Sequence, residues 1–245
     1  MPLADLQEKW IGLFHQMRQK FGAGIPLAAP FLSVALEGHD PASHQTILYI
    51  GKATRGWGPE PLRDNSTVAE CRQFTVGFFE NSIILNTYHS AFWRFARRLK
   101  SLTGEEADRP WRNLVWSNIA KIGAQYGNPN RRCLNYQAEL AKQTLVAEII
   151  EYRPSLVVFV SGDFGQTIVN DALKSDELRA LEPNEQNQQG ANVWEERPGN
   201  VWLRKRYGNS PAFLRLAHPQ GKPRERIDQW VEYAQALLQG DPPPG

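Results

Sequence analysis

One short stretch of the sequence, residues 47–57, constrains the fold more than any other. It opens with the wholly apolar run Ile47-Leu48-Tyr49-Ile50 and passes abruptly into Gly51-Lys52-Ala53-Thr54-Arg55-Gly56-Trp57. An apolar run of this length is typical of a strand buried on both faces of a parallel sheet. A glycine directly after it suits a sharp exit where the backbone approaches another group closely. We therefore expect a strand over 47–50 and a turn over 51–57.

Three further apolar runs predict strands of the same kind, over residues 113–118, 155–161 and 213–217. Around them, apolar residues recur every three or four positions, as in amphipathic helices. Such helices are expected over residues 91–102, 135–151 and 223–238. Strands that alternate with helices predict a single α/β domain over residues 1–245. It is expected to be a three-layer α/β/α domain with a central, mainly parallel four-stranded sheet.

The other segments predict peripheral structure. Residues 3–22 have the pattern of an amphipathic helix that caps the domain, whereas residues 25–46 contain three prolines and predict a loop. Pro198-Gly199-Asn200 lies between two short apolar segments, which indicates a hairpin. Asp163 follows the strand over 155–161 and is placed to cap the next helix. The proline-rich tail, 241–245, is expected to be disordered.

Composition excludes several classes of protein. Hydrophobic residues make up 41% of the chain, enough for a core, and the net charge of +2 does not by itself demand a nucleic-acid partner. The two cysteines, Cys71 and Cys133, cannot alone ligate a tetrahedral zinc or a four-thiolate cluster, and they predict reduced thiols. The sequence contains no apolar run of about 18 residues, so no membrane span is predicted. We expect a cytoplasmic monomer without a metal or another cofactor.

Marked polar residues follow three of the predicted strands. They are Gly51-Lys52-Ala53-Thr54, Ser117-Asn118 and His218-Pro219-Gln220-Gly221. Because the carboxyl ends of parallel strands meet at one edge of a sheet, where ligands bind, these residues are predicted to form one site. Taken singly, each has a structural interpretation as part of a turn, a cap or a solvated helix start. Their convergence favours a site.

In order, spacing and strand–helix setting, these motifs resemble the uracil-DNA glycosylase superfamily over about residues 45–238. That family has a parallel sheet with a Gly-x-Asp/Asn/Ala-Pro motif after one strand, an Asn that reads the base edge, and a His-Pro-Ser motif after the last strand. Gly51–Thr54 stands at the first motif, Asn118 at the base-reading position and His218–Gly221 at the second motif. The resemblance implies the same fold and DNA as the partner.

Two departures from the family bear on catalysis. Ala53 stands where the family has its water-activating carboxylate or amide, and Thr54 replaces the proline that follows. Some branches also carry Ala at this position and still cleave, whereas branches with an iron–sulfur cluster supply four cysteines, which this chain lacks. Asp64, near the first motif, is the candidate that remains for positioning water.

The residue types suit cleavage of an N-glycosidic bond, in which the base departs as an anion. His218 and Asn118 can stabilise that anion, and the Asn118 amide offers both a donor and an acceptor to a uracil edge. A flipped nucleotide also needs an aromatic platform, for which the candidates are Trp57, Phe74, Phe78 and Phe79. The flanking phosphates need cations, for which the candidates are Lys222, Arg224 and Arg226.

We therefore expect a DNA glycosylase that removes uracil or another deaminated or damaged base. His218 and Asp64 are the expected catalytic residues, and the base is expected to contact Gly51, Lys52, Ala53, Thr54, Trp57 and Asn118. Because Ala53 replaces the water activator, a second interpretation is a protein that binds a nucleobase, nucleotide or DNA without cleaving it. A third is a hydrolase of another small substrate, with His218 as base and Asp64 or Asp163 as its partner, although no Gly-x-Ser-x-Gly nucleophile motif is present.

Overall fold

The structure is a computed structural model that describes most of the chain. The described ranges are 1–21, 25–41, 45–57, 67–84, 86–104, 111–181, 194–206 and 208–241. Asp64, the predicted water-positioning residue, lies outside these ranges, as do residues 242–245 of the predicted tail. Of the helix predicted over 3–22, the described part is α1 (Leu3–Phe21). Within the same ranges, no helix is long and apolar enough to cross a membrane.

The described strands form one mixed sheet of seven strands in the order β1-β3-β2-β4-β7-β6-β5. Its centre consists of four parallel strands: β3 (Leu114–Ala124), β2 (Ile47–Arg55), β4 (Leu156–Phe159) and β7 (Ala212–Arg215). These are the four strands that the apolar runs predict, and their parallel pairing is confirmed. The carboxyl ends of all four therefore point the same way.

Antiparallel strands extend both edges, so the predicted number of four strands is wrong. β1 (Leu27–Pro30) pairs with β3, although the sequence predicts a loop there. On the opposite edge, β6 (Val201–Arg204) pairs with β7, and β5 (Glu195–Arg197) pairs with β6 to form the predicted hairpin. β1 is short and ends in proline, a combination that is tolerated at a sheet edge but gives almost no strand signal.

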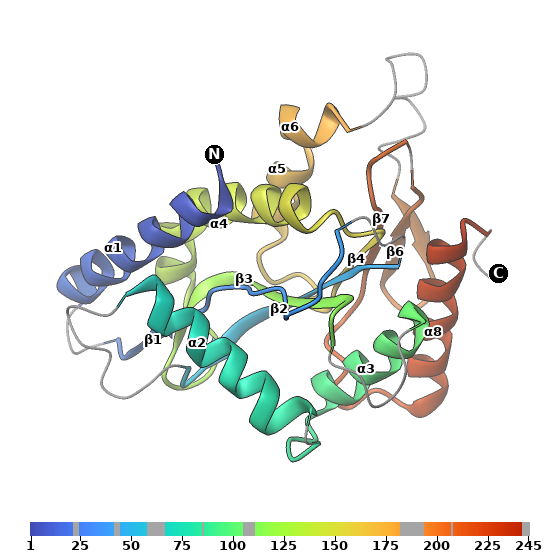
Figure 1. The fold of residues 1–245 in the computed structure, drawn as a ribbon, viewed down its shortest axis with the longest axis horizontal. Coiled ribbons are helices and arrows are strands. Elements are labelled where there is room, and N and C mark those ends of the chain that lie inside the picture. The colour runs from blue at the N-terminus through green and yellow to red at the C-terminus, as the bar shows by residue number, and fades with distance from the viewer. Residues whose placement is uncertain are drawn as a thin grey trace.

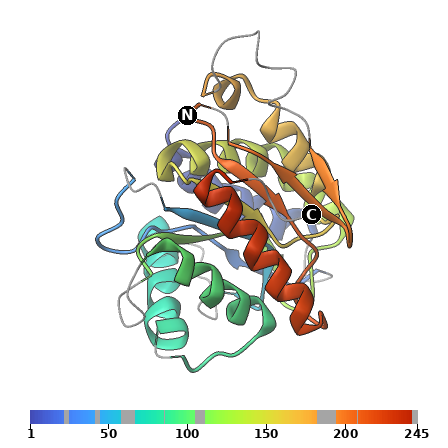
Figure 2. The same cartoon turned by 90° about the vertical axis from the view of Figure 1, so that its right-hand side faces the viewer.

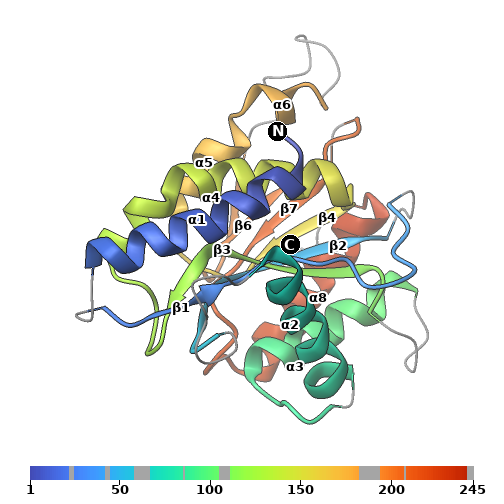
Figure 3. The same ribbon diagram turned by 60° about the vertical axis from the view of Figure 1, so that its left-hand side comes forward.

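Helices cover both faces of the sheet (Figures 1 and 3). One face carries α1, α4 (Arg131–Tyr152) and α5 (Gln166–Leu173), and the other carries α2 (Val68–Phe78), α3 (Ala91–Lys100) and α8 (Arg224–Gln239). α8 crosses the sheet over β4 and β7 (Figure 2). Three short helical segments complete the described elements, Phe79–Ile84, Ser101–Thr103 and α6 (Asp176–Arg179).

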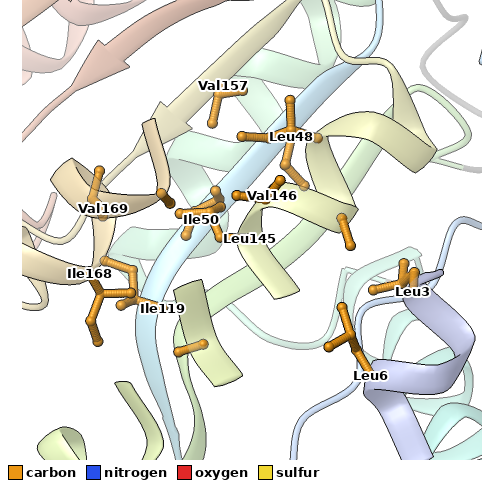
Figure 4. Close-up of a cluster of buried hydrophobic side chains, with 14 of the residues drawn as sticks. Leu3, Leu6, Leu48, Ile50, Ile119, Leu145, Val146, Val157, Ile168 and Val169 are labelled. Carbon is orange, nitrogen blue, oxygen red and sulfur yellow. The ribbon is translucent and has the colours of Figure 1, made fainter. Parts of the chain in front are cut away.

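Successive side chains along each strand point to opposite faces of the sheet, so the core has one part on each face. Leu48 and Ile50 of β2 point toward α4 and pack with Leu145 and Val146 (Figure 4), whereas Tyr49 points toward α3. Period-2 alternation in a strand with two buried faces produces the continuous apolar run seen in the sequence. The face of the sheet that carries α2 and α3 is rich in aromatic rings, and the face that carries α4 is mainly aliphatic.

A buried polar network joins β3 to α4 on the aliphatic face. The Lys121 ammonium pairs with the Glu148 carboxylate and donates to Ser117 Oγ. Glu148 also accepts hydrogen bonds from Ser117 Oγ (2.8 Å) and Ser33 Oγ (2.6 Å). Burial lowers the pKa of Lys121, while the Glu148 charge opposes that shift. A charged pair sealed in a core is stable only when its hydrogen bonds are supplied in this way.

The sequence predicts that Asp163 caps α5, and this prediction is wrong. The cap residue is Gly165, whose positive φ of 68° places it in the left-handed region. Asp163 Oδ1 instead accepts a hydrogen bond from Arg215 Nη2 at 3.0 Å, across the ends of β4 and β7. The exposed Asp163 carboxylate is therefore directed toward the buried guanidinium of Arg215 and not toward the start of the helix.

Candidate functional site

β2 and β3 extend beyond their neighbours and form a step at the carboxyl edge of the sheet. β4 pairs with β2 as far as Phe159 opposite Ile50, and β7 ends beside it. β2 and β3 stay paired from Gly51 and Asn118 onward, to the ends of both strands. The predicted turn at 51–57 and the predicted strand end at Asn118 are therefore wrong. The two long strands satisfy each other's backbone groups where β4 no longer can.

Asn118 lies directly over Gly51 at the base of this step. The two residues are register partners, and a Cβ on Gly51 would lie 2.5 Å from Asn118 Oδ1. Only 3% of Asn118 is exposed, and its Nδ2 has no hydrogen-bond partner among the described residues. A buried amide donor without a partner costs about 1–3 kcal/mol, and a ligand or water molecule that accepts its hydrogen bond would remove that cost.

Phe92, in the first turn of α3, forms a wall beside Gly51 and Asn118. Its Cε2 would be 3.0 Å from a Cβ on Gly51. The Tyr49 hydroxyl donates to the Phe92 carbonyl at 3.0 Å, and the two rings are 4.5 Å apart, which fixes the start of α3 over β2. The sequence places Phe92 on the apolar face of a helix, and this pattern gives no sign that the ring reaches the site.

His218, in the segment after β7, joins the same group of residues. Its ring is nearly parallel to that of Phe92, with an interplanar angle of 20° and centroids 6.2 Å apart. The backbone N–H of Gln220 donates to His218 Nδ1 at 3.2 Å, so the neutral ring carries its proton on Nε2. Burial lowers the pKa of His218, and the Lys52 charge lowers it further. At neutral pH, His218 is therefore a neutral hydrogen-bond donor.

The remaining residues of the first motif, Lys52 to Thr54, lie along β2. Lys52 and Ala53 are half-buried, and Ala53 is on the same face as Gly51 because strand side chains alternate. Ala53 therefore presents a methyl group where a polar side chain would face the step. Thr54 is buried, and its hydroxyl lacks a partner among the described residues.

Trp57 lies inside the aromatic core rather than at the step. It is 9% exposed, and four rings pack edge-on against it, those of Phe31, Phe74, Phe78 and Trp116. Phe79 is also buried, at 1% exposed. Phe74 and Phe78 are half-buried, and among the described residues none of these candidate rings packs against His218 as Phe92 does.

The three cations after His218 occupy different surroundings. Lys222 and Arg224 are exposed, and Arg224 lies 3.9 Å from the Asp228 carboxylate. Arg226 Nη1 instead donates to the carbonyl of Pro198 at 3.1 Å, below the turn between β5 and β6. Arg226 therefore holds the hairpin, which leaves Lys222 and Arg224 as the freer cations of this set.

The described residues contain no group of three or more His, Cys, Asp or Glu side chains placed to hold a metal ion. Both cysteines are buried and free. Burial, with a smaller contribution from Glu70, raises the pKa of Cys71 to about 11, so its reactive thiolate form is scarce at neutral pH. Neither thiol lies among the residues of the step.

The step thus brings together Gly51 of β2, Asn118 of β3, Phe92 of α3 and His218 from the segment after β7. The sequence identifies three of these residues and misses Phe92. Comparison with known proteins adds no relative: no family model matches the chain, and a search of curated proteins finds no match.

Proposed function

We propose that the chain is a DNA glycosylase that removes uracil or another deaminated or damaged base, and that it is a divergent member of the uracil-DNA glycosylase superfamily. The observation that carries the proposal is the buried Asn118 amide, whose Nδ2 has no partner among the described residues. It lies against Gly51 together with Phe92, whose ring is nearly parallel to that of the neutral His218. The Asn118 and His218 side chains are both donors, and a pyrimidine or purine edge with exocyclic carbonyl oxygens would supply acceptors for them. The parallel sheet and the order of the motifs along the chain also support it.

Each residue of the step has a role in this reaction. A flipped base stacks on Phe92, and its edge accepts hydrogen bonds from Asn118 Nδ2 and His218 Nε2. As the C1′–N bond breaks, its electron pair leaves with the base, and the two donors stabilise the negative charge that forms on the base oxygens. A water oxygen then bonds to C1′ and gives up a proton, which neutralises the departing base anion. Gly51 carries no side chain and so leaves room for the Asn118 amide and the Phe92 ring, the two groups that contact the base.

Ala53 supports a second candidate, a protein that binds a nucleobase or damaged DNA on the same fold without cleaving it. Its methyl group faces the step and cannot activate water. Asp64, the other candidate for that task, lies outside the described residues. Binding without base release would distinguish this candidate from a glycosylase.

Base release from DNA tests the proposal directly. Single- and double-stranded oligonucleotides with one uracil, hypoxanthine or xanthine are incubated with the protein and then treated with alkali, which breaks the strand at an abasic site. We expect breaks with the parent protein and at least 100-fold slower release with His218→Ala. Absence of breaks on every substrate at enzyme excess would contradict the glycosylase. Calorimetry with the same DNA would then test the binding protein.

A further inference from the structure

A second polar feature lies at the far end of the two long strands, in a surface hollow between the end of α1 and the start of α4. Its volume is about 550 Å³, and it is lined by Lys20, Phe21, Arg131, Arg132, Asn135 and Tyr136. Three of these six side chains are cationic and none is acidic. A concave surface with one sign of charge concentrates an oppositely charged ligand.

Aromatic rings hold two of the cations in place. Lys20 Nζ lies over the Tyr136 ring at 4.4 Å from its centroid, and Arg132 Cζ lies over the Phe21 ring at 5.1 Å. The two rings contact each other edge-on at 5.6 Å. Long cationic side chains usually lose much conformational freedom when they bind an anion, and this packing removes part of that loss beforehand.

The charge of the hollow is not neutralised by acidic side chains of the described ranges. Among the residues that the structure describes, none of Lys20, Arg131 and Arg132 forms an ion pair with a carboxylate. The first acid along α4, Glu139, is itself paired with Lys142 at 2.8 Å. Since the rings are already covered by cations, the hollow suits a compact anion better than a stacked base. A phosphate fits this chemistry.

The position of the hollow connects it to the step. Asn118 is six residues from the end of β3 at Ala124, about 20 Å of strand, and the loop over residues 125–130 carries the chain beyond that point to α4 at Arg131. About six base pairs of duplex span the strand part alone. We propose that the hollow binds a backbone phosphate of DNA outside the base pairs next to the flipped nucleotide. This inference rests on the proposed function, because it takes DNA as the ligand.

Salt-dependent binding to duplexes of two lengths tests the inference. The probe carries one tetrahydrofuran abasic analogue, with either 3 or 12 base pairs on each side, and hairpin loops close both ends of each duplex so that the short one stays paired. The test variant is Lys20→Gln/Arg131→Gln/Arg132→Gln, and the control is Lys9→Gln/Lys174→Gln/Lys205→Gln, which removes the same charge from exposed positions elsewhere. On the long duplex, we expect the log–log salt slope of the test variant to fall by about 0.9 for each phosphate that it no longer neutralises. The short duplex should show no difference from the control.

Equal slopes for the test and control variants on the long duplex would overturn the hollow as a phosphate site, as would a parent protein that does not bind either duplex. Thermal unfolding of both variants checks that each retains the fold. Uracil release from the short duplex reports separately on the proposed function. Normal release with equal slopes overturns the hollow alone, whereas a hollow-dependent slope without release overturns the glycosylase alone.

Discussion

Asn118 Oδ1 occupies the space that a side chain on Gly51 would need. The two residues face each other on β3 and β2, and the distance from the amide oxygen to a Cβ would be only 2.5 Å. The glycine therefore does more than permit a turn, since β2 continues through it. Its missing side chain allows the amide to lie flat against the strand and to face the step.

Gly51→Ala is expected to displace the Asn118 amide and the Phe92 ring while the fold is retained. A methyl group forced into a packed space costs about 1–3 kcal/mol of stability, and base release should fall much further because both binding groups move. Release kinetics and thermal unfolding measure the two effects. Gly12→Ala is the control, because nothing lies within 4 Å of its Cβ. Equal release by Gly51→Ala and the parent would contradict the assigned site.

Asn118→Asp tests whether this residue reads the base. The substitution keeps the shape but replaces the donor with a second acceptor, which would face a base oxygen. We expect the loss of uracil release to be greater than about 100-fold and greater than for Asn118→Ala. Single-turnover assays on uracil and hypoxanthine DNA provide the comparison. An Asp variant as active as the parent would place the base elsewhere.

The pKa of His218 is expected to lie below 6.5, the usual value for histidine, because the ring is half-buried and Lys52 repels the imidazolium. Lys52→Gln should raise that pKa, whereas Lys9→Gln should leave it unchanged. NMR titration of the imidazole resonances, assigned with His218→Gln, measures both. Below pH 6.5 the unfolded chain binds this proton more readily than the folded chain does, so acid lowers the free energy of unfolding. A pKa above 6.5 would contradict the burial of this ring.

Substitution of Arg226 should have a different effect from substitution of its neighbours Lys222 and Arg224. Lys222→Gln/Arg224→Gln is expected to reduce the salt slope of DNA binding by about 0.9 for each duplex phosphate that these cations neutralise, with no change in stability. Arg226→Gln should instead loosen the turn at Pro198, which hydrogen exchange of the β5–β6 amides would detect. An unchanged slope for the double variant would mean that Lys222 and Arg224 only face water.

Glu148→Gln should be strongly destabilising, by about 3–5 kcal/mol, because it leaves the Lys121 charge buried without its partner. Chemical denaturation measures the loss. Lys121→Met/Glu148→Leu removes both charges and should regain most of the stability. A single variant as stable as the parent would show that Lys121 readily gives up its proton in the folded protein.

The strands of the centre are predictable because each is buried on both faces and so appears as an unbroken apolar run. Their ends are not. Lys52 and Lys121 look like loop residues in the sequence, yet both lie within strands. The burial of Lys121 depends on Glu148, 27 residues away along the chain, and a local pattern carries no sign of that partner.

The residues of the site also divide into those that the sequence identifies and those that it does not. Gly51, Asn118 and His218 can be identified because polar residues after apolar runs stand out. Phe92 cannot, because an aromatic residue on the apolar face of a helix has the same pattern whether it fills the core or reaches a site. Trp57 illustrates the converse, because its position beside the first motif gives no sign of the four rings that enclose it.

The Lys121–Glu148 pair also determines which side chain of β3 faces the step. Ser117 and Asn118 are adjacent, so they point to opposite faces, and a slip of one residue would exchange them. The same slip would carry the ammonium of Lys121, which now lies over the Phe31 ring at 5.8 Å from its centroid, away from the Glu148 carboxylate. The ion pair thereby disfavours the alternative alignment of β3. A charge that adds little net stability can thus protect the arrangement on the other side of the strand by making the wrong alignment prohibitively unfavourable.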